Sequence, residues 1–491
     1  MSSSPTGVRI VTYNVLSSHL CEPDHFPKCS PDYLDPTYRY TKLEDKLLVE
    51  INNGAIICLQ EVSTEWAGYL HSFFAENNYV LITGLYGKKF NGYMGVATAV
   101  PLHLYKIQSA SIDTLSDFIP EELLTPKKPW TAPPKKDNGV SVSGVFKALL
   151  NCFNLFMKLV CSWFGSSEKA EDPAKKDPWA DEPPFDGARY RVNQMISVTL
   201  LPLAAPAAAA ESRTGRRKSG AQAPKSAEFL VSNYHMPCMF KKPFVMTIHS
   251  TLAALVTRKL ATIRKGRSTV VIPHVLAGDF NLTPVSGMYH SIVTTCRAGN
   301  SHAPVFDGVD TIPPNFDKFL TLFYSEQGLH HDNSEDDVSV IKDDIKFYSL
   351  YREVNGEEPD FTNYATAMSW GGGKSSEFTF IDTLDYLFVS TEGWAPITSD
   401  DAHAGDADAT VAKSTSVRRK SGGRSTKSDA LSLSPADTNK HMLIPVHHRD
   451  SVTEATAESS SPKVDKGLFG PYPSKDEHSD HIMIGGSLYL N

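Results

Sequence analysis

The stretch VLAGDFNLTP at residues 275–284 ends an apolar run on a carboxylate and a carboxamide. Asp279 and Asn281 lie on either side of Phe280, and Pro284 closes the segment. A chain keeps such polar groups away from its core unless something binds them. Because side chains alternate along an extended strand, we expect Asp279 and Asn281 to face one pocket while Phe280 anchors the turn in the core.

Similar polar residues stand at the ends of the other apolar runs. Carboxylate and carboxamide oxygens are ligands for a hard divalent cation, and amide and imidazole N–H groups can bind the oxygens of a phosphate. Taken singly, each of these residues also fits a turn or a helix start. Together they predict one site, because α/β scaffolds place chemistry in the loops at strand ends. The set comprises Tyr13–Asn14, Gln60–Glu61, Asn233, His235, Asp279, Asn281, Asp385 and Asp480–His481.

The elements that position these residues alternate between strands and helices. Helices are expected at residues 41–52, 63–77 and 243–263, the second with Ser63 as its N-cap. This alternation predicts an α/β fold in which two packed mixed sheets are flanked by helices. Strands are expected at residues 8–15, 55–60, 79–83, 93–100, 103–110, 189–200, 228–235, 270–278, 385–390 and 481–490.

Three stretches differ in composition from the rest of the chain. Residues 118–186 are rich in Pro, Lys and Asp, residues 201–227 include an alanine run and GRRKS, and residues 396–475 are rich in Ser, Asp, Ala and Thr. A compact domain does not need loops of this length, so we interpret the three as flexible insertions. The chain is therefore predicted to be a single domain over residues 1–491 with three interruptions.

Two features lie inside these insertions. Residues 145–164 would form a helix whose few polar residues make one narrow stripe, and such a helix could pack on its own domain, lie in a membrane interface or bind a partner groove. The repeated string RRKS resembles a basophilic-kinase site at Ser219 and at Ser421, although it is also a frequent accident in solvated loops.

Bulk composition limits the class of protein. The 491 residues carry a net charge of −8, with 41% apolar and 21% charged residues, which describes a globular chain without a broadly basic surface. The seven cysteines form no CxxC pair, so neither a structural zinc site nor a disulfide partner is expected. The first residues contain no signal-peptide core, and we expect an intracellular, cytoplasmic protein.

The ordered set of polar motifs resembles the endonuclease/exonuclease/phosphatase superfamily. The motifs are YN at 13–14, LQEV at 59–62, NYH at 233–235, GDFN at 278–281, DY at 385–386 and SDH at 479–481. The resemblance implies a DNase I-like, four-layer α/β sandwich. FTNY at 361–364, GDFNLTPVSGMY, GYMGVATAVP and YLDPTYRYTKL are similar to the branch that holds the carbon-catabolite-repressor deadenylases, nocturnin, angel proteins and the 2′,5′-phosphodiesterase. NYHMPC departs from that branch, which often has a second histidine there.

This resemblance implies hydrolysis of a phosphodiester with Mg²⁺, or with Mn²⁺ as its substitute. The implied metal ligands are Asn14, Glu61 and Asp480. The implied catalytic residues are His235, Asp279, Asn281, Asp385 and His481, with Asp279 acting on the attacking water. Phe361 and Asn363 are the implied substrate-binding residues, and Phe361 would stack on a base.

The sequence leaves the substrate open between classes. The first hypothesis is a 3′–5′ exoribonuclease of the poly(A)-deadenylase type. The second is a phosphatase or phosphodiesterase for a small nucleotide, such as 2′,5′-oligoadenylate or the 2′-phosphate of NADPH, or for a phospholipid headgroup. A third is an inactive scaffold, which the complete set of polar residues disfavours.

Overall fold

The computed structural model describes residues 7–126, 182–203, 228–265, 268–293, 312–327, 347–371, 374–394, 472–475 and 477–490. The expected helix at 145–164, Ser219, Ser421 and most of the three predicted insertions lie outside the described residues.

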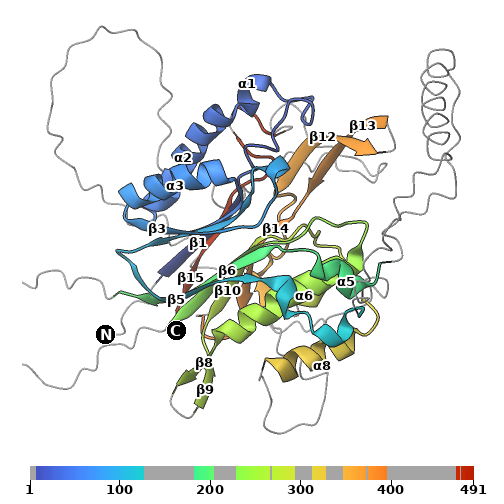
Figure 1. Cartoon of the computed structure of the whole chain (residues 1–491). Helices are drawn as coiled ribbons and strands as arrows, with labels where there is room; N and C mark the ends of the chain where they lie inside the picture. The colour runs from blue at the N-terminus through green and yellow to red at the C-terminus, as the bar shows by residue number, and fades with distance from the viewer. Residues whose placement is uncertain are drawn as a thin grey trace, which may run out of the picture.

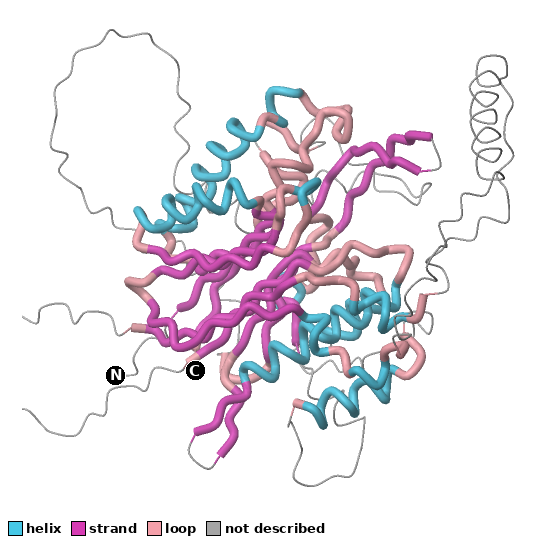
Figure 2. Tube along the Cα trace, in the orientation of Figure 1, coloured by secondary structure: helices cyan, strands magenta, loops and turns pink. Residues whose placement is uncertain are grey.

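Two mixed sheets pack face to face (Figures 1 and 2). The first has the strand order β15-β1-β2-β4-β3, with β15 at Ile484–Tyr489, β1 at Gly7–Asn14, β2 at Ile56–Val62, β4 at Gly95–Pro101 and β3 at Tyr79–Leu85. The second has the order β11-β14-β10-β7-β6-β5, with β11 at Phe347–Ser349, β14 at Asp385–Ser390, β10 at His274–Asp279, β7 at Phe229–His235, β6 at Gln194–Pro202 and β5 at Tyr105–Thr114.

Apolar side chains of both sheets fill the space between them. Ile10, Ile56 and Val96 of the first sheet meet Val231 and Val275 of the second in one buried cluster. Removing such surface from water contributes on the order of 25 cal/mol per Å² and drives the two sheets together.

Helices cover the outer face of each sheet (Figure 1). On the first sheet lie α2 at Pro36–Asn52 and α3 at Thr64–Glu76, preceded by the short α1 at Pro31–Leu34. On the second lie α5 at Pro184–Arg189, α6 at Pro243–Ala261, α7 at Gly287–Ile292 and α8 at Phe316–Glu326. The order helix, sheet, sheet, helix confirms the predicted four-layer α/β sandwich.

The remaining elements are short or project from the sandwich. Two separate hairpins are β8–β9, at Thr262–Lys265 and Ser268–Val271, and β12–β13, at Asn363–Gly371 and Lys374–Asp382. The short helices are η1 at Lys89–Asn91, η2 at Leu115–Phe118, η3 at Glu121–Leu123 and α10 at Leu350–Asn355. Among the described helices, none combines the length and the apolar character that crossing a membrane requires.

The local predictions are mostly confirmed, with corrections at boundaries. The Ser63 hydroxyl accepts from the Trp66 amide and caps α3 as expected. Helix α2 begins at Pro36 rather than near residue 41, because Asp35 caps it by accepting from Tyr38 N. The expected strand at 270–278 is wrong as one element, since its first residues pair in the β8–β9 hairpin and β10 starts only at His274.

Four insertion boundaries also need correction. The first insertion begins later than expected, since Ile119 belongs to the core and η3 spans Glu121–Leu123, and the third ends earlier, since Tyr472 is buried and bridges Ala365.

Residues 184–186 begin α5, whose Phe185 belongs to the core under the second sheet, and residues 201–202 complete β6. Strand β6 starts at Gln194, later than expected, because α5 ends at Arg189 and residues 190–193 form the turn and loop between them.

Candidate active site

The pairing of the strands brings the predicted residues to one edge of the sandwich. Strands β1 and β2 run parallel, so Asn14 lies opposite Gln60 where both strands end. Strands β7 and β10 also run parallel, and Asp279 lies opposite His235 at their ends. Strand β14 runs antiparallel to β10, so it begins with Asp385 at the same edge, opposite Asp279.

Asn14 connects the carboxylates of the two sheets. Its Nδ2 lies 3.2 Å from Glu61 Oε1 and 2.9 Å from Asp279 Oδ2, and its Oδ1 accepts from the amide of Leu16 at 2.9 Å. The same Nδ2 lies 3.4 Å from His481 Nε2. One buried amide group therefore touches three predicted site residues that come from three segments of the chain.

Glu61 reaches the site through an irregular end of β2. The pairing of β2 with β4 shifts register between Leu59 and Val62, and Glu61 has a φ of 59°, in the left-handed region. Such a conformation costs a non-glycine residue on the order of 1 kcal/mol and is typical of bulges that redirect a side chain. The carboxylate is held by Ser17, whose backbone N–H donates to Oε2 at 3.1 Å.

The GDFN turn is built from a glycine and a buried aromatic ring. Gly278 has a φ of 146°, and a Cβ there would lie 1.8 Å from Tyr234 O, so only glycine fits. Phe280 is fully buried against Tyr386 and Phe388, as predicted.

Strand alternation does not explain how Asn281 is placed. Strand β10 ends at Asp279, and Asn281 has a φ of 49°. The Asp279 carboxylate instead accepts from the Asn281 backbone N–H at 2.9 Å, which closes the turn. The Asn281 side chain donates one hydrogen to the carbonyl of Met236 at 2.9 Å and keeps a second one.

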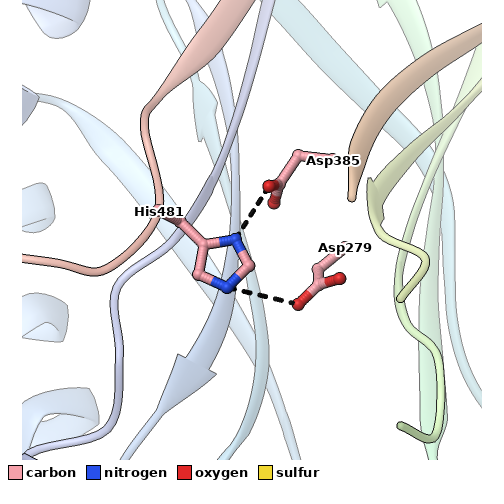
Figure 3. A group of neighbouring side chains, drawn as sticks. All are labelled: Asp279, Asp385 and His481. Carbon is pink, nitrogen blue, oxygen red and sulfur yellow. Dashed lines mark hydrogen bonds and ion pairs between the residues drawn. The ribbon is translucent and has the colours of Figure 1, made fainter. Parts of the chain in front are cut away.

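His481 lies between two buried carboxylates, as Figure 3 shows. Its Nδ1 lies 2.8 Å from Asp385 Oδ2 and its Nε2 lies 3.8 Å from Asp279 Oδ2. Thr362 also donates to Asp385 Oδ2, at 2.7 Å. The three site residues offer ligand atoms within 4.8 Å of one another, a spacing at which a metal ion could bind.

The charges in this group favour a protonated imidazole over a metal ligand. Burial disfavours the charged ring, but the carboxylates of Asp385, Asp480 and Asp279 outweigh it and hold the pKa of His481 well above its usual value. An imidazolium has no lone pair to offer a cation. Burial raises the pKa of Asp279, while the positive charge of His481 opposes that rise.

His235 faces both carboxylates that Asn14 touches. Its Nε2 lies 3.6 Å from Asp279 Oδ2 and 3.9 Å from Glu61 Oε1. The side chain is 8% exposed, so these groups meet in a nearly dry environment where their interactions are strong.

The surroundings of Asp480 are consistent with a cation bound near Glu61 and Asp480. The Oδ1 atom of Asp480 is buried without a donor among the described residues, and burial together with the negative charge of Glu61 raises its pKa. A buried carboxylate oxygen without a donor is costly, and a divalent cation would relieve it. Glu61 and Asp480 thus have the oxygen chemistry that Mg²⁺ needs. The predicted third ligand, Asn14, instead turns its Nδ2 hydrogens toward Glu61 and uses its Oδ1 to accept from Leu16 N.

The predicted substrate-binding residues stay predictions. Asn363 forms an isolated bridge with His481 and its side chain hydrogen-bonds to Asp480. Phe361 is only 5% exposed and packs edge-on against Tyr364, so most of its ring is not available to stack on a base.

Two other polar residues of the predicted set join the sheets. Asn233 donates to the carbonyls of Leu59 and Ala97, and Gln60 donates to Asn233 Oδ1 at 2.8 Å. They lie beneath the site and hold the two sheets in register.

Sequence reasoning missed three polar residues that contact the predicted ones. Thr362 donates to Asp385, and Tyr86 and Asn193 contact His235. Thr362 lies within FTNY, so that motif carried a usable signal. Tyr86 and Asn193 lie outside every motif, and only the packing of the two sheets places them at His235.

No protein-family model matches the chain, and the comparison with curated proteins finds no match. Among solved structures, the chain is similar to ANGEL2, described as a 2′,3′-cyclic phosphatase in complex with adenosine-2′,3′-vanadate, at 13% identity over 99% of this chain and 96% of that chain, with a TM-score of 0.49. The catalytic domain of human Nocturnin matches at 12% identity over 80% of this chain and 86% of that chain, with a TM-score of 0.39. TDP2 of D. rerio, complexed with single-strand DNA product, matches at 10% identity over 80% and 87% of the two chains, with a TM-score of 0.35.

Proposed function

We propose that this chain is a magnesium-dependent phosphoesterase whose active site lies between the ends of its two sheets. One observation carries the proposal: the Asn14 amide lies within hydrogen-bonding distance of both Glu61 and Asp279. A single small ion and one phosphate would therefore be within reach of groups from both sheets. The gathering of several carboxylates also supports the proposal, together with Asp480 Oδ1, which has no donor among the residues that the structure describes.

The residues divide the work by their chemistry. Glu61 and Asp480 would hold the ion, which when bound neutralises phosphate charge. Asn14 would hold the carboxylates of Glu61 and Asp279 in place by donating to both. Asp279 accepts hydrogen bonds on both oxygens, from Asn14 and from Asn281 N, and so is oriented to accept a proton from an attacking water. His481, charged and fixed by Asp385, stabilises negative charge on the phosphoryl oxygens, as does the free amide hydrogen of Asn281.

We further propose that the substrate is the 3′ end of an RNA, since FTNY and GDFNLTPVSGMY resemble the deadenylase-like branch. Exposed positive and aromatic side chains are compatible with an RNA substrate. Lys88 and Lys89 are exposed next to the exposed ring of Phe90, and such groups bind phosphates and bases of single strands. The test is a screen with Mg²⁺ over poly(A) RNA, 2′,5′-oligoadenylate, NADPH and sphingomyelin. Shortening of poly(A) from its 3′ end supports the proposal, and turnover of only a small nucleotide or lipid overturns the RNA assignment.

The first prediction tests the proposed roles of Glu61 and Asp279. Glu61→Gln and Asp279→Asn keep side-chain shape and should each lower kcat by at least about 100-fold, because each removes one charged element of catalysis. Glu65→Gln is the matched control, since Glu65 is an exposed carboxylate in the first turn of α3. Near-normal magnesium-dependent turnover in either site variant, with thermal unfolding unchanged, contradicts the roles.

A further inference from the structure

The hydroxyl of Tyr86 and the side-chain amide of Asn193 contact His235, in addition to the carboxylates that face its Nε2. Tyr86, the first residue after β3, has its hydroxyl 3.2 Å from Nδ1 of His235. Asn193, just before β6, has its Nδ2 2.9 Å from the backbone carbonyl of His235 and 3.3 Å from the Tyr86 hydroxyl. Three segments of the chain thus close a small hydrogen-bonded ring around one imidazole.

The contacts fix which group donates in each of these hydrogen bonds. The His235 carbonyl only accepts, so the NH₂ end of the Asn193 amide must face it, and the same nitrogen donates to the Tyr86 oxygen. Among the described residues, the only recorded acceptor for the Tyr86 hydrogen is Nδ1 of His235. A neutral imidazole that accepts at Nδ1 carries its hydrogen on Nε2.

The other side of the ring favours the same tautomer. Nε2 faces Asp279 Oδ2 at 3.6 Å and Glu61 Oε1 at 3.9 Å. A lone pair on Nε2 would be repelled by these oxygens, whereas an N–H is attracted. Burial and the charge of Glu61 also raise the pKa of Tyr86, so the phenol keeps the hydrogen that it donates.

We propose that Tyr86 and Asn193 are positioning residues that fix His235 in the Nε2–H tautomer and so make it a hydrogen-bond donor to the phosphoryl group rather than a metal ligand. The catalytic part of this inference rests on the phosphoesterase function proposed above. The tautomer itself does not, because it follows from contacts within the protein.

The tautomer is tested directly in the metal-free protein. Selective ¹⁵N labelling of histidine, with the His235 signals assigned by their loss in His235→Gln, reports which ring nitrogen carries the hydrogen. We expect Nε2–H in the wild type and a mixture of tautomers in Tyr86→Phe. Asn193→Asp, which accepts the phenol hydrogen, should shift His235 toward Nδ1–H. An Nδ1–H form in the wild-type protein overturns the proposal, whether or not the protein is active.

The catalytic consequence is tested by a double-mutant cycle. Tyr86→Phe should lower kcat about 10-fold, the usual scale for losing an orienting partner, with the magnesium half-saturation unchanged. In the His235→Gln background, whose amide has no tautomer to fix, Tyr86→Phe should have no further effect. An equal loss of kcat in both backgrounds overturns the positioning role, and so does a parallel rise in the magnesium half-saturation.

A matched control exists in the same strand. Tyr234 donates to Nδ1 of His249 at 2.9 Å, on the face of β7 that packs against α6. Tyr234→Phe removes the same kind of bond outside the site, so it should lower the melting temperature and leave kcat unchanged. If wild-type protein hydrolyses no substrate with Mg²⁺, the proposed function fails while the tautomer measurement still decides the inference.

Discussion

At the scale of single residues, the best-paired charge in the site is the imidazole of His481. Asp385 takes hydrogen bonds from Thr362 and His481 on one oxygen, and its position at the start of β14 makes it rigid. His481 in turn faces Asp279. Asp385 therefore holds the His481 ring in a fixed position and favours its protonated form.

Asp385→Asn tests this pair at the residue scale. The amide keeps the shape but removes the charge that holds His481 protonated, so we expect kcat to fall about 100-fold and the activity to decline at a lower pH than in wild type. The measurement is kcat against pH with saturating Mg²⁺. Asp382→Asn, at the end of β13, is the control, and a wild-type pH profile in Asp385→Asn would contradict the role.

At the scale of elements, one part of the site, the segment at 477–481, lies outside the strands and needs contacts from a helix. The segment at 477–481, which carries Asp480 and His481, has to be fixed against the end of β1. Arg39 on α2 does this, because it donates to the carbonyl of His478 at 2.7 Å and to that of Val15 at 2.7 Å. Its guanidinium is fully buried over the ring of Trp66, 5.0 Å from the ring centroid.

Arg39→Met should therefore destabilise the fold and loosen the site together. Leaving buried carbonyls without a donor costs about 1–3 kcal/mol each, and kcat should fall at temperatures where the variant is still folded. Arg9→Met is the matched control, since Arg9 on β1 pairs with Glu50 on the same helix α2 at the opposite end. Equal losses of activity in the two variants, measured at matched stability, would show that Arg39 has no special role in the site.

At the scale of the whole molecule, buried polar groups hold the layers in register. Gln60 and Asn233 join the two sheets, and His249 joins α6 to both β7 and α5 by accepting from Tyr234 and donating to the carbonyl of Ala188 at 3.0 Å. Burial lowers the pKa of His249 to about 4, so it is neutral in the folded protein at neutral pH. It is part of the packing and not of the site.

This predicts loss of stability in acid. An unfolded chain binds a proton at His249 below a pH of about 6.5, whereas the folded protein does so only below about 4, so the contribution is complete above the first value and is lost as pH falls toward the second. Between these two pH values, His249 makes the free energy of unfolding fall by about 1.4 kcal/mol for each unit that the pH is lowered. Urea unfolding of wild type and His249→Gln between these pH values should show a smaller slope in the variant, and equal slopes would contradict the assignment.

The sequence by itself determined the two-sheet architecture, the order of the site residues and the strand ends that carry them. It could do so because apolar periodicity and glycine positions such as Gly278 are local properties of the chain. The predicted geometry of Asn281 was wrong, because its turn depends on a hydrogen bond from its backbone N–H to Asp279. The sequence also did not separate β9 from β10 or predict the helix α5 before β6.

Only the tertiary structure decided which remote side chains support the site. Tyr86 and Asn193 lie outside every motif, and Arg39 lies in YLDPTYRYTKL, which by itself does not indicate what Arg39 contacts. All three act because the packing of two sheets and a helix brings them within hydrogen-bonding distance of His235 and His478. Such contacts depend on the register between segments that are far apart in the chain, and local sequence does not encode that register.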